Sequence, residues 1–380
     1  MNINNAVSEL KSIRYEVVAG IFVKIISVFL SILLIPKIAS GENYYLVLTY
    51  TIGLVNMSKI FDGALPYLQR ICYAQGSVLT LKSEINYSIF VYLIHFLIFF
   101  IITSDYLISI SLTIFGKLYA IANFRLNISK RSYFFYLQHA FPLGICLFLK
   151  DLIGIYPDYV YIFVSYAILI IGLASNRFQV VKEIKTKPLA DLWTPNISMN
   201  LLTMLVFFCY AEFAAVFLYG NIPLADYAII NSVTKVVLVL IGAASVISTP
   251  LWNYGNRNIG TLDKLSFTPI LYLPFFSFSI LGYFISTHNS DLQIFSIIDI
   301  KTLFLILIIG SGSVANLFIS QILARLELSK HLLFLSIFEL SVMVGILLAY
   351  SNTHNYFMVW MILIIFKYLT GIFILRVKDA

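Results

Sequence analysis

Apolar runs long enough to cross a lipid bilayer recur along the whole of this 380-residue sequence. A membrane-spanning helix needs about 20 mainly apolar residues, because it rises about 1.5 Å per residue through a hydrocarbon core about 30 Å thick. Hydrophobic residues make up 60% of the chain and charged residues only 11%. Soluble domains carry about 25% charged residues, so this composition excludes a water-soluble fold. We therefore predict an all-α polytopic membrane protein.

The apolar runs predict about twelve transmembrane helices, arranged as two six-helix lobes around a central cavity. Residues 1–16 are expected to form a cytoplasmic amphipathic lead-in, 17–175 the N-terminal lobe, 176–194 a cytoplasmic linker and 195–380 the C-terminal lobe. The individual spans are expected at residues 17–38, 44–66, 87–105, 106–122, 133–149, 158–175, 195–219, 227–250, 267–287, 302–322, 332–350 and 355–375.

The distribution of Lys and Arg orients these spans. With the amino terminus in the cytoplasm, seventeen of the 25 positive residues fall in inner segments, three in outer segments and five inside spans. Cytoplasmic loops carry the excess of Lys and Arg in membrane proteins, so both termini are predicted to be cytoplasmic. This asymmetry explains the net charge of +7, which therefore does not indicate a nucleic-acid partner. The five positive residues inside spans are Lys24, Lys59, Lys117, Lys235 and Lys367.

The span 44–66 contains two charged residues, Lys59 and Asp62, which are three residues apart and therefore share a helical face. A charge at the bilayer centre costs about 2.5–3.5 kcal/mol on insertion scales, so such residues usually face a bundle interior or a water-filled cavity. We interpret the two residues as part of a polar cavity through the membrane. The alternative is a self-neutralising pair near the inner interface, because Asp62 lies only four residues before Pro66.

Four of the lysines inside spans are candidates for a cationic substrate-binding cavity. Lys235 lies near the membrane centre and shares a helical face with Asn231. The other three lie about 10–12 Å from the inner surface at helical rise, a depth that snorkelling of the amine explains poorly. Snorkelling or structural lysines are the alternative interpretation. The predicted substrate-binding residues are Lys24, Lys59, Lys235, Lys367, Asn231 and Arg70.

Three carboxylates within the spans, Glu212, Glu339 and Asp62, are candidates for ion coupling. Apolar surroundings favour the neutral carboxyl, so Glu212 and Glu339, which have no adjacent base in sequence, are predicted to exchange protons. Asp62 should instead stay ionised beside Lys59. For Glu212 and Glu339 the alternative is a neutral or cross-paired structural acid, and the coupling ion is left open between proton and sodium. The cysteines lack metal-ligand spacing, and no constellation predicts catalysis.

A series of small motifs follows in a characteristic order over nearly the whole chain. They are the basic leader before Gly20 and Lys24, Ile35-Pro36 at the end of the first span, Gly41 before Tyr44-Tyr45, Asp62-Gly63-Ala64 with Arg70 beyond, Arg125 between the fourth and fifth spans, and Tyr227 and Pro250 around the eighth span. In this order of elements the chain resembles the polysaccharide-transport branch of the multidrug/oligosaccharidyl-lipid/polysaccharide exporter superfamily, the O-antigen-type repeat-unit flippases.

The resemblance implies a flippase in the bacterial cytoplasmic (inner) membrane that moves undecaprenyl-pyrophosphate-linked oligosaccharides from the cytoplasmic to the periplasmic leaflet. Its two lobes would rock by alternating access around a cationic cavity, which suits an anionic pyrophosphate-sugar. The resemblance also implies membrane lipid, a polysaccharide polymerase and a chain-length regulator as partners in lipopolysaccharide synthesis. It implies no cofactor and no enzymatic step.

Three alternative functions stay open at this point. A drug or cation exporter of the same superfamily would need acidic cavity walls, whereas the spans contain five lysines and three acids. A membrane glycosyltransferase or O-antigen polymerase would need catalytic residues on sizeable outer loops, and the predicted outer loops are short. A purely structural membrane protein would leave the lysines in the spans unexplained.

Overall fold

A computed structural model describes the chain between residues 22 and 379, with gaps. The described residues are 22–61 except 24 and 28, 77–79, 81–128, 133–154, 156–175, 185–187, 199, 202, 206, 212–238 except 236, 308–310, 312–313, 315–316, 319 and 329–379.

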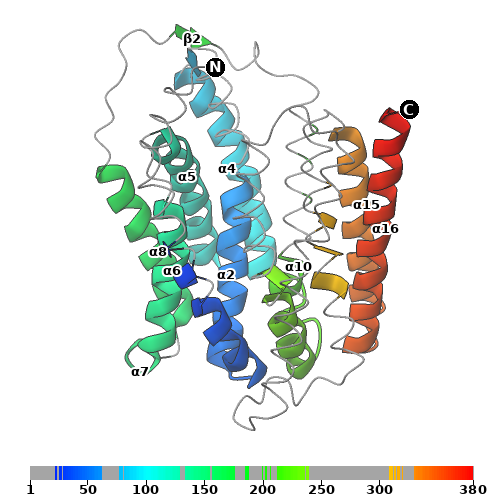
Figure 1. The fold of residues 1–380 in the computed structure, drawn as a ribbon. Helices are drawn as coiled ribbons and strands as arrows, with labels where there is room; N and C mark the ends of the chain where they lie inside the picture. The colour runs from blue at the N-terminus through cyan, green and yellow to red at the C-terminus, as the bar shows by residue number, and fades with distance from the viewer. Residues whose placement is uncertain are drawn as a thin grey trace. The chain divides into compact units, whose positions relative to one another are not determined.

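Long apolar helices dominate the described residues (Figure 1) and confirm the predicted all-α polytopic membrane fold. They are α2 (Asn43–Phe61), α4 (Leu81–Thr103), α5 (Tyr106–Ile128), α6 (Tyr133–Phe148), α8 (Pro157–Ala174), α15 (Ser329–Leu348) and α16 (Thr353–Asp379). Among the residues that the structure describes, three segments, within α8, α15 and α16, are long and apolar enough by themselves to cross a membrane, and four shorter apolar helical segments accompany them. The total of twelve spans stays a prediction, because several of the expected spans lie outside the described residues.

The chain forms two compact units, which are described separately below. The first comprises Met1–Leu30 and Val47–Phe208, and the second comprises Ser31–Leu46 and Cys209–Ala380. The helix α2 therefore begins in the second unit and continues in the first. The predicted lobes at 17–175 and 195–380, and the cavity between them, stay predictions.

In the first unit, α5 packs against both α4 and α8, and α8 packs in turn against α6. A short turn joins α4 to α5, and the carboxylate of Asp105 caps the start of α5. Its Oδ1 accepts hydrogen bonds from the backbone N–H groups of Leu107 at 2.8 Å and Ile108 at 3.0 Å. An aspartate satisfies the free N–H groups of a first helical turn in this way, so the boundary expected at residue 105 is explained by a cap.

Both helices extend further than the predicted spans, at the ends away from the turn that joins them. The expected spans were 87–105 and 106–122, but α4 begins at Leu81 and α5 ends at Ile128. The apolar run marks only the stretch that hydrocarbon surrounds, while backbone hydrogen bonds continue the helix through flanking polar residues.

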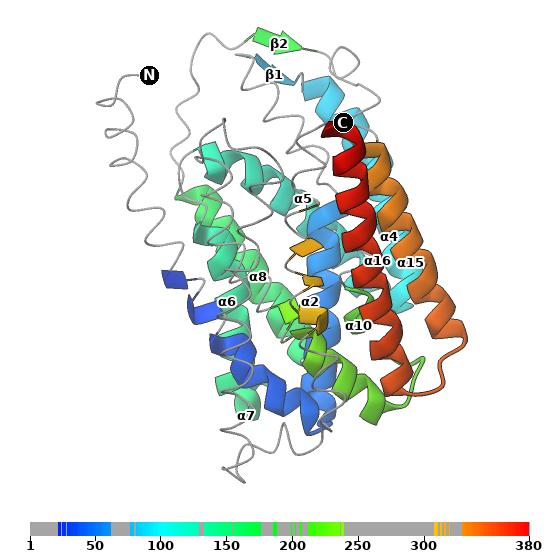
Figure 2. The same ribbon diagram turned by 45° about the vertical axis from the view of Figure 1, so that its right-hand side comes forward.

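Two short strands that the sequence analysis did not foresee join loops of the first unit. Strand β1 (Ser77–Leu79) pairs in parallel with β2 (Lys185–Lys187), with Ser77 opposite Lys185 (Figure 2). Strand β2 lies within the expected linker 176–194. The pairing joins the segment between α2 and α4 to the segment after α8 within this unit.

Close approach of α2, α4 and α5 depends on Gly116 in the middle of α5. A Cβ at this position would lie 2.6 Å from the His95 ring on α4 and 2.6 Å from the Ser58 carbonyl oxygen on α2. Distances this short are not tolerated, so only glycine permits the packing. Small residues serve the same purpose in many membrane helix interfaces, because lipid offers no hydrophobic driving force between helices.

In the second unit, two glycines let α16 lie close to the helical residues of 308–319. A Cβ on Gly312 would collide with Ile364, and a Cβ on Gly371 would collide with Ile319. From the first contact to the second, both segments advance by seven residues, so the two segments run in the same direction. The tenth and twelfth predicted spans share a direction across the membrane, and this packing agrees with that order.

Candidate functional site

A buried ion pair joins α15 and α16. Lys367 Nζ lies 2.8 Å from Glu339 Oε2, and the two side chains are only 4% and 3% exposed. Figures 1 and 2 show the two helices side by side over much of their length. Both residues lie well inside their helices, more than two turns from the nearest end.

Aromatic residues flank this ion pair in sequence. Phe338 and Phe366, the neighbours of the two charged residues, are partly exposed, and their ring centroids are 4.9 Å apart. The α15–α16 contact thus combines a buried ion pair with a contact between two aromatic rings. A buried pair of this kind is expensive to break, because removing one partner leaves an uncompensated charge in a medium of low dielectric constant.

A second buried lysine and glutamate interact electrostatically in the same unit. Lys235 is 8% exposed and Glu212 is 5% exposed, and the charge of Glu212 acts on the lysine amine. Glu212 occupies the N-cap position of the one-turn helix α10 (Phe213–Val216). From the sequence, the lysines were predicted to bind substrate and the glutamates to couple ions. In the structure, Glu339 forms an ion pair with Lys367, and Glu212 acts electrostatically on Lys235.

Hydrogen bonds connect the helical residues 224–235 to α10. Asn231 Nδ2 donates to the carbonyl oxygens of Ala214 and Tyr227, each at 3.0 Å. The Tyr227 hydroxyl donates to the Ala215 carbonyl oxygen at 2.8 Å. Asn231 is fully buried in this arrangement, and Lys235 lies one helical turn further along the same helix. Its predicted contact with substrate stays a prediction.

Lys59 in the first unit has different surroundings. Its amine donates to Asn56 Oδ1 at 3.0 Å and lies 5.7 Å from the ring centroid of Tyr119 on α5. The residue is half-buried. One of these partners is a neutral amide and the other is an aromatic face, which attracts a cation through its ring quadrupole.

Several predicted site residues lie outside the described part of the chain, namely Lys24, Asp62 and Arg70. Of the described ones, Lys59 belongs to the first unit, whereas Lys235, Lys367, Asn231, Glu212 and Glu339 belong to the second. A single cavity shared by the four lysines thus stays a prediction, as does ion coupling through the three carboxylates.

Some relevant partners were missed by the sequence analysis. Asn56 shares a helical face with Lys59, three residues away, and this spacing was available from the sequence. The pairing of Glu339 with Lys367 was not, since 28 residues and a turn separate them. His139 on α6 interacts through Nδ1 with the hydroxyl of Tyr161 on α8 at 2.8 Å.

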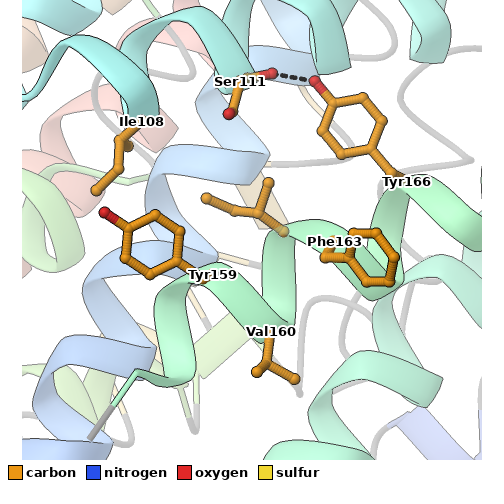
Figure 3. Close-up of a pocket in the computed structure, with 7 residues that line it drawn as sticks. Ile108, Ser111, Tyr159, Val160, Phe163 and Tyr166 are labelled. Carbon is orange, nitrogen blue, oxygen red and sulfur yellow. Dashed lines mark hydrogen bonds between the residues drawn. The ribbon is translucent and has the colours of Figure 1, made fainter.

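Two pockets lie on the individual units. The first, of about 500 Å³, lies between α5 and α8 and is mostly apolar. Figure 3 shows Tyr159, Phe163 and Tyr166 of α8 beside Ile108 and Ser111 of α5, with the Tyr166 hydroxyl donating to the Ser111 carbonyl oxygen. This pocket brings together no ionisable pair and is best suited to hydrocarbon.

The second pocket, of about 620 Å³, lies where α15 ends and α16 begins. Its lining joins apolar positions of both helices, among them Ile346 and Met358, to polar residues of the connecting turn such as Asn352. In the described part of the chain no group of three or more His, Cys, Asp or Glu residues could hold a metal ion.

Comparison with known proteins adds information on the fold. No protein-family model and no curated protein sequence matches the chain. Among solved structures, the chain is similar to a MOP superfamily transporter from Pyrococcus furiosus, which is described as having a binding pocket of reverse polarity. The two chains are 10% identical, with a TM-score of 0.47, and the match covers 96% of this chain and 95% of that one. It is also similar to a multidrug resistance MATE family transporter of the MOP superfamily in an outward-facing conformation, at 12% identity and a TM-score of 0.51, covering 96% and 95% of the two chains. At this level of identity the second similarity speaks for the fold alone, and the chain has the fold of a MOP superfamily transporter.

Proposed function

We propose that this protein is a flippase that translocates undecaprenyl-pyrophosphate-linked oligosaccharide repeat units from the cytoplasmic to the periplasmic leaflet of a bacterial inner membrane. Its fold, shared over almost the full length with a membrane transporter, supports transport as the general activity. The resemblance of its ordered sequence motifs to repeat-unit flippases supports the substrate class.

The observation that carries the substrate class is the half-buried amine of Lys59 within an apolar helix. Held by Asn56 and the ring of Tyr119, it can offer positive charge to a pyrophosphate while it stays inserted in the membrane. A charged headgroup cannot cross hydrocarbon unaided, so a carrier must replace its hydration with charge-assisted contacts. Lys24 and Arg70 are proposed to add to this positive surface.

Lys235 and Lys367 contribute differently in this proposal, because each has a buried glutamate close by. Protonating Glu339 or Glu212 would leave net positive charge in an apolar region, so a proton would bind most easily when the pair opens. We therefore propose that coupling to protons or sodium acts through opening and closing of these pairs during alternating access.

Translocation in reconstituted vesicles tests the substrate class. Lys59→Ala should sharply reduce flipping of a fluorescent undecaprenyl-pyrophosphate oligosaccharide, and Lys59→Arg should retain more activity, because the charge is kept. Lys117→Ala is the matched control, since Lys117 also lies over a tyrosine ring, that of Tyr92, in the same unit. Equal activity of Lys59→Ala and Lys117→Ala would remove Lys59 from the substrate path.

Ion coupling has its own test in the same vesicles. Glu212→Gln and Glu339→Gln should each weaken the dependence of transport on an imposed pH or sodium gradient. If both variants keep the full gradient dependence, neither carboxylate couples transport to an ion, although the flippase assignment would stand.

A multidrug exporter is the second candidate, favoured by the similarity in fold to a MATE family transporter. Efflux of a cationic dye from vesicles, with no flipping of the lipid-linked oligosaccharide, would decide for this candidate. A polysaccharide polymerase and a chain-length regulator are expected as partners only if the protein is a repeat-unit flippase. Membrane lipid is expected as a partner of either candidate.

A further inference from the structure

The pocket at the α15–α16 turn has a polar end and an apolar floor. The polar end is formed by the turn and the first residues of α16, and Asn352, His354 and Asn355 are all exposed there. The floor extends down α15 past Ile346 to Gly345, and along α16 to Met358. Such a division matches an amphiphile, whose polar headgroup and hydrocarbon chain need different surroundings.

Hydrogen bonds hold the polar end in one arrangement. Asn352 Oδ1 accepts from the backbone N–H of Asn355 at 2.8 Å, and Asn355 Nδ2 donates to Ser351 Oγ at 2.6 Å. From outside the turn, Asp226 Oδ1 accepts from the Thr353 hydroxyl at 2.6 Å. These bonds use the Asn352 amide oxygen and the Asn355 amide nitrogen, and the second amide atom of each exposed side chain can donate to or accept from a ligand.

We infer that this pocket binds the uncharged sugar headgroup of a glycosylated lipid. None of the described residues that line it is Lys, Arg, Asp or Glu. A phosphate headgroup would call for Lys or Arg, whereas amide, hydroxyl and imidazole groups pair with the many hydroxyls of a sugar. The partly buried ring of Tyr350 adds an apolar surface beside these groups.

For a repeat-unit flippase this pocket would hold the oligosaccharide at the outer end of the second unit, a role that rests on the proposed function. Binding of a glycosylated lipid as such does not depend on it. Glycolipid binding by the pocket and its role in oligosaccharide transport can therefore be refuted independently of each other.

Gly345 offers a way to fill the pocket without disturbing the protein. A Cβ added there meets nothing within 4 Å, so a large side chain has room to enter the pocket. Replacing an exposed helical glycine also favours the helix. Val344→Trp is the matched control, because its neighbour Val344 is exposed on the same helix and does not line the pocket.

The experiment counts lipids bound to the full-length protein by native mass spectrometry. The probes are a diglycosyl diacylglycerol and a phosphatidylcholine with the same acyl chains. The wild type should retain the glycolipid about tenfold better than phosphatidylcholine, and Gly345→Trp should lose this excess while Val344→Trp keeps it. His354→Ala should reduce the preference for sugar, whereas His331→Ala, at the exposed start of α15, should not.

Equal retention of the two probes by the wild type would overturn the inference and leave a groove for hydrocarbon alone. Glycolipid retention by Gly345→Trp at the wild-type level would place the site elsewhere and overturn it as well. Vesicle translocation of the lipid-linked oligosaccharide by the same proteins separates the two proposals. If the protein binds the glycolipid selectively but does not translocate the lipid-linked oligosaccharide, the flippase proposal is refuted and the glycolipid site stands. If Gly345→Trp translocates the oligosaccharide as well as the wild type does, the pocket does not hold the oligosaccharide during transport.

Discussion

Lys59 and Lys367 are both lysines inside apolar helices, and the two compact units treat them differently. Lys59 in the first unit is half-buried and is held by an amide and an aromatic ring. Lys367 in the second unit is almost fully buried and forms an ion pair with Glu339. The first arrangement leaves the amine half-exposed beside an amide and an aromatic ring, whereas the second pairs the charge with a carboxylate inside the protein.

The difference between the two lysines shows that the position of a lysine within an apolar run does not by itself reveal its functional role. A lysine at a given depth can be stabilised by partial exposure and polarisable neighbours, or by a carboxylate of another helix. The two solutions have opposite consequences for function. A charge that can bind substrate should be cheap to remove from the folded protein, and a charge that is cancelled inside should be costly to remove.

The largest effect is expected from breaking the buried ion pair. Glu339→Ala should destabilise the protein by about 3–5 kcal/mol, because Lys367 would stay charged in an apolar environment. Equilibrium unfolding in mixed micelles of a denaturing and a mild detergent measures this change in the free energy of unfolding. The double variant Glu339→Leu/Lys367→Met should recover most of the lost stability, and a double variant as unstable as the single one would contradict the assignment of a charge penalty.

A smaller loss is expected from overpacking the helix contact in the second unit. Gly371→Ala places a methyl group against Ile319 and should cost about 1–3 kcal/mol in the same unfolding assay. Gly345→Ala, on the neighbouring α15, meets open space and should be neutral or slightly stabilising. Similar losses for both variants would show that the close packing at Gly371 is not what the substitution disturbs.

The smallest change in stability is expected at Lys59. Lys59→Ala removes one hydrogen bond and a cation–π contact at a half-buried position, so it should cost no more than about 1 kcal/mol. This small effect should accompany the large loss of transport expected for the same variant. A loss of stability as great as that of Glu339→Ala would make Lys59 a structural residue and would remove the contrast between the two units.

The helical architecture could be predicted well from the sequence, and the partnerships within the site could not. The turn between the expected third and fourth spans was predicted to within two residues, because Asp105 interrupts the apolar pattern at the point where it caps α5. Helix ends in polar surroundings were placed less well, since backbone hydrogen bonding continues where hydrophobicity stops. Glu339 seemed isolated in its apolar run, because its partner lies on the next helix, 28 residues away.

What the sequence by itself determined is that this chain is a bundle of membrane-spanning helices. Apolar length alone dictates this outcome, because every backbone polar group within lipid must find its partner inside its own helix. The tertiary structure decided which charges meet, since side-chain pairing depends on helix contacts that no local pattern encodes. The buried pair of Lys367 with Glu339 and the close contacts at Gly116 and Gly371 arise only when helices distant in sequence lie side by side.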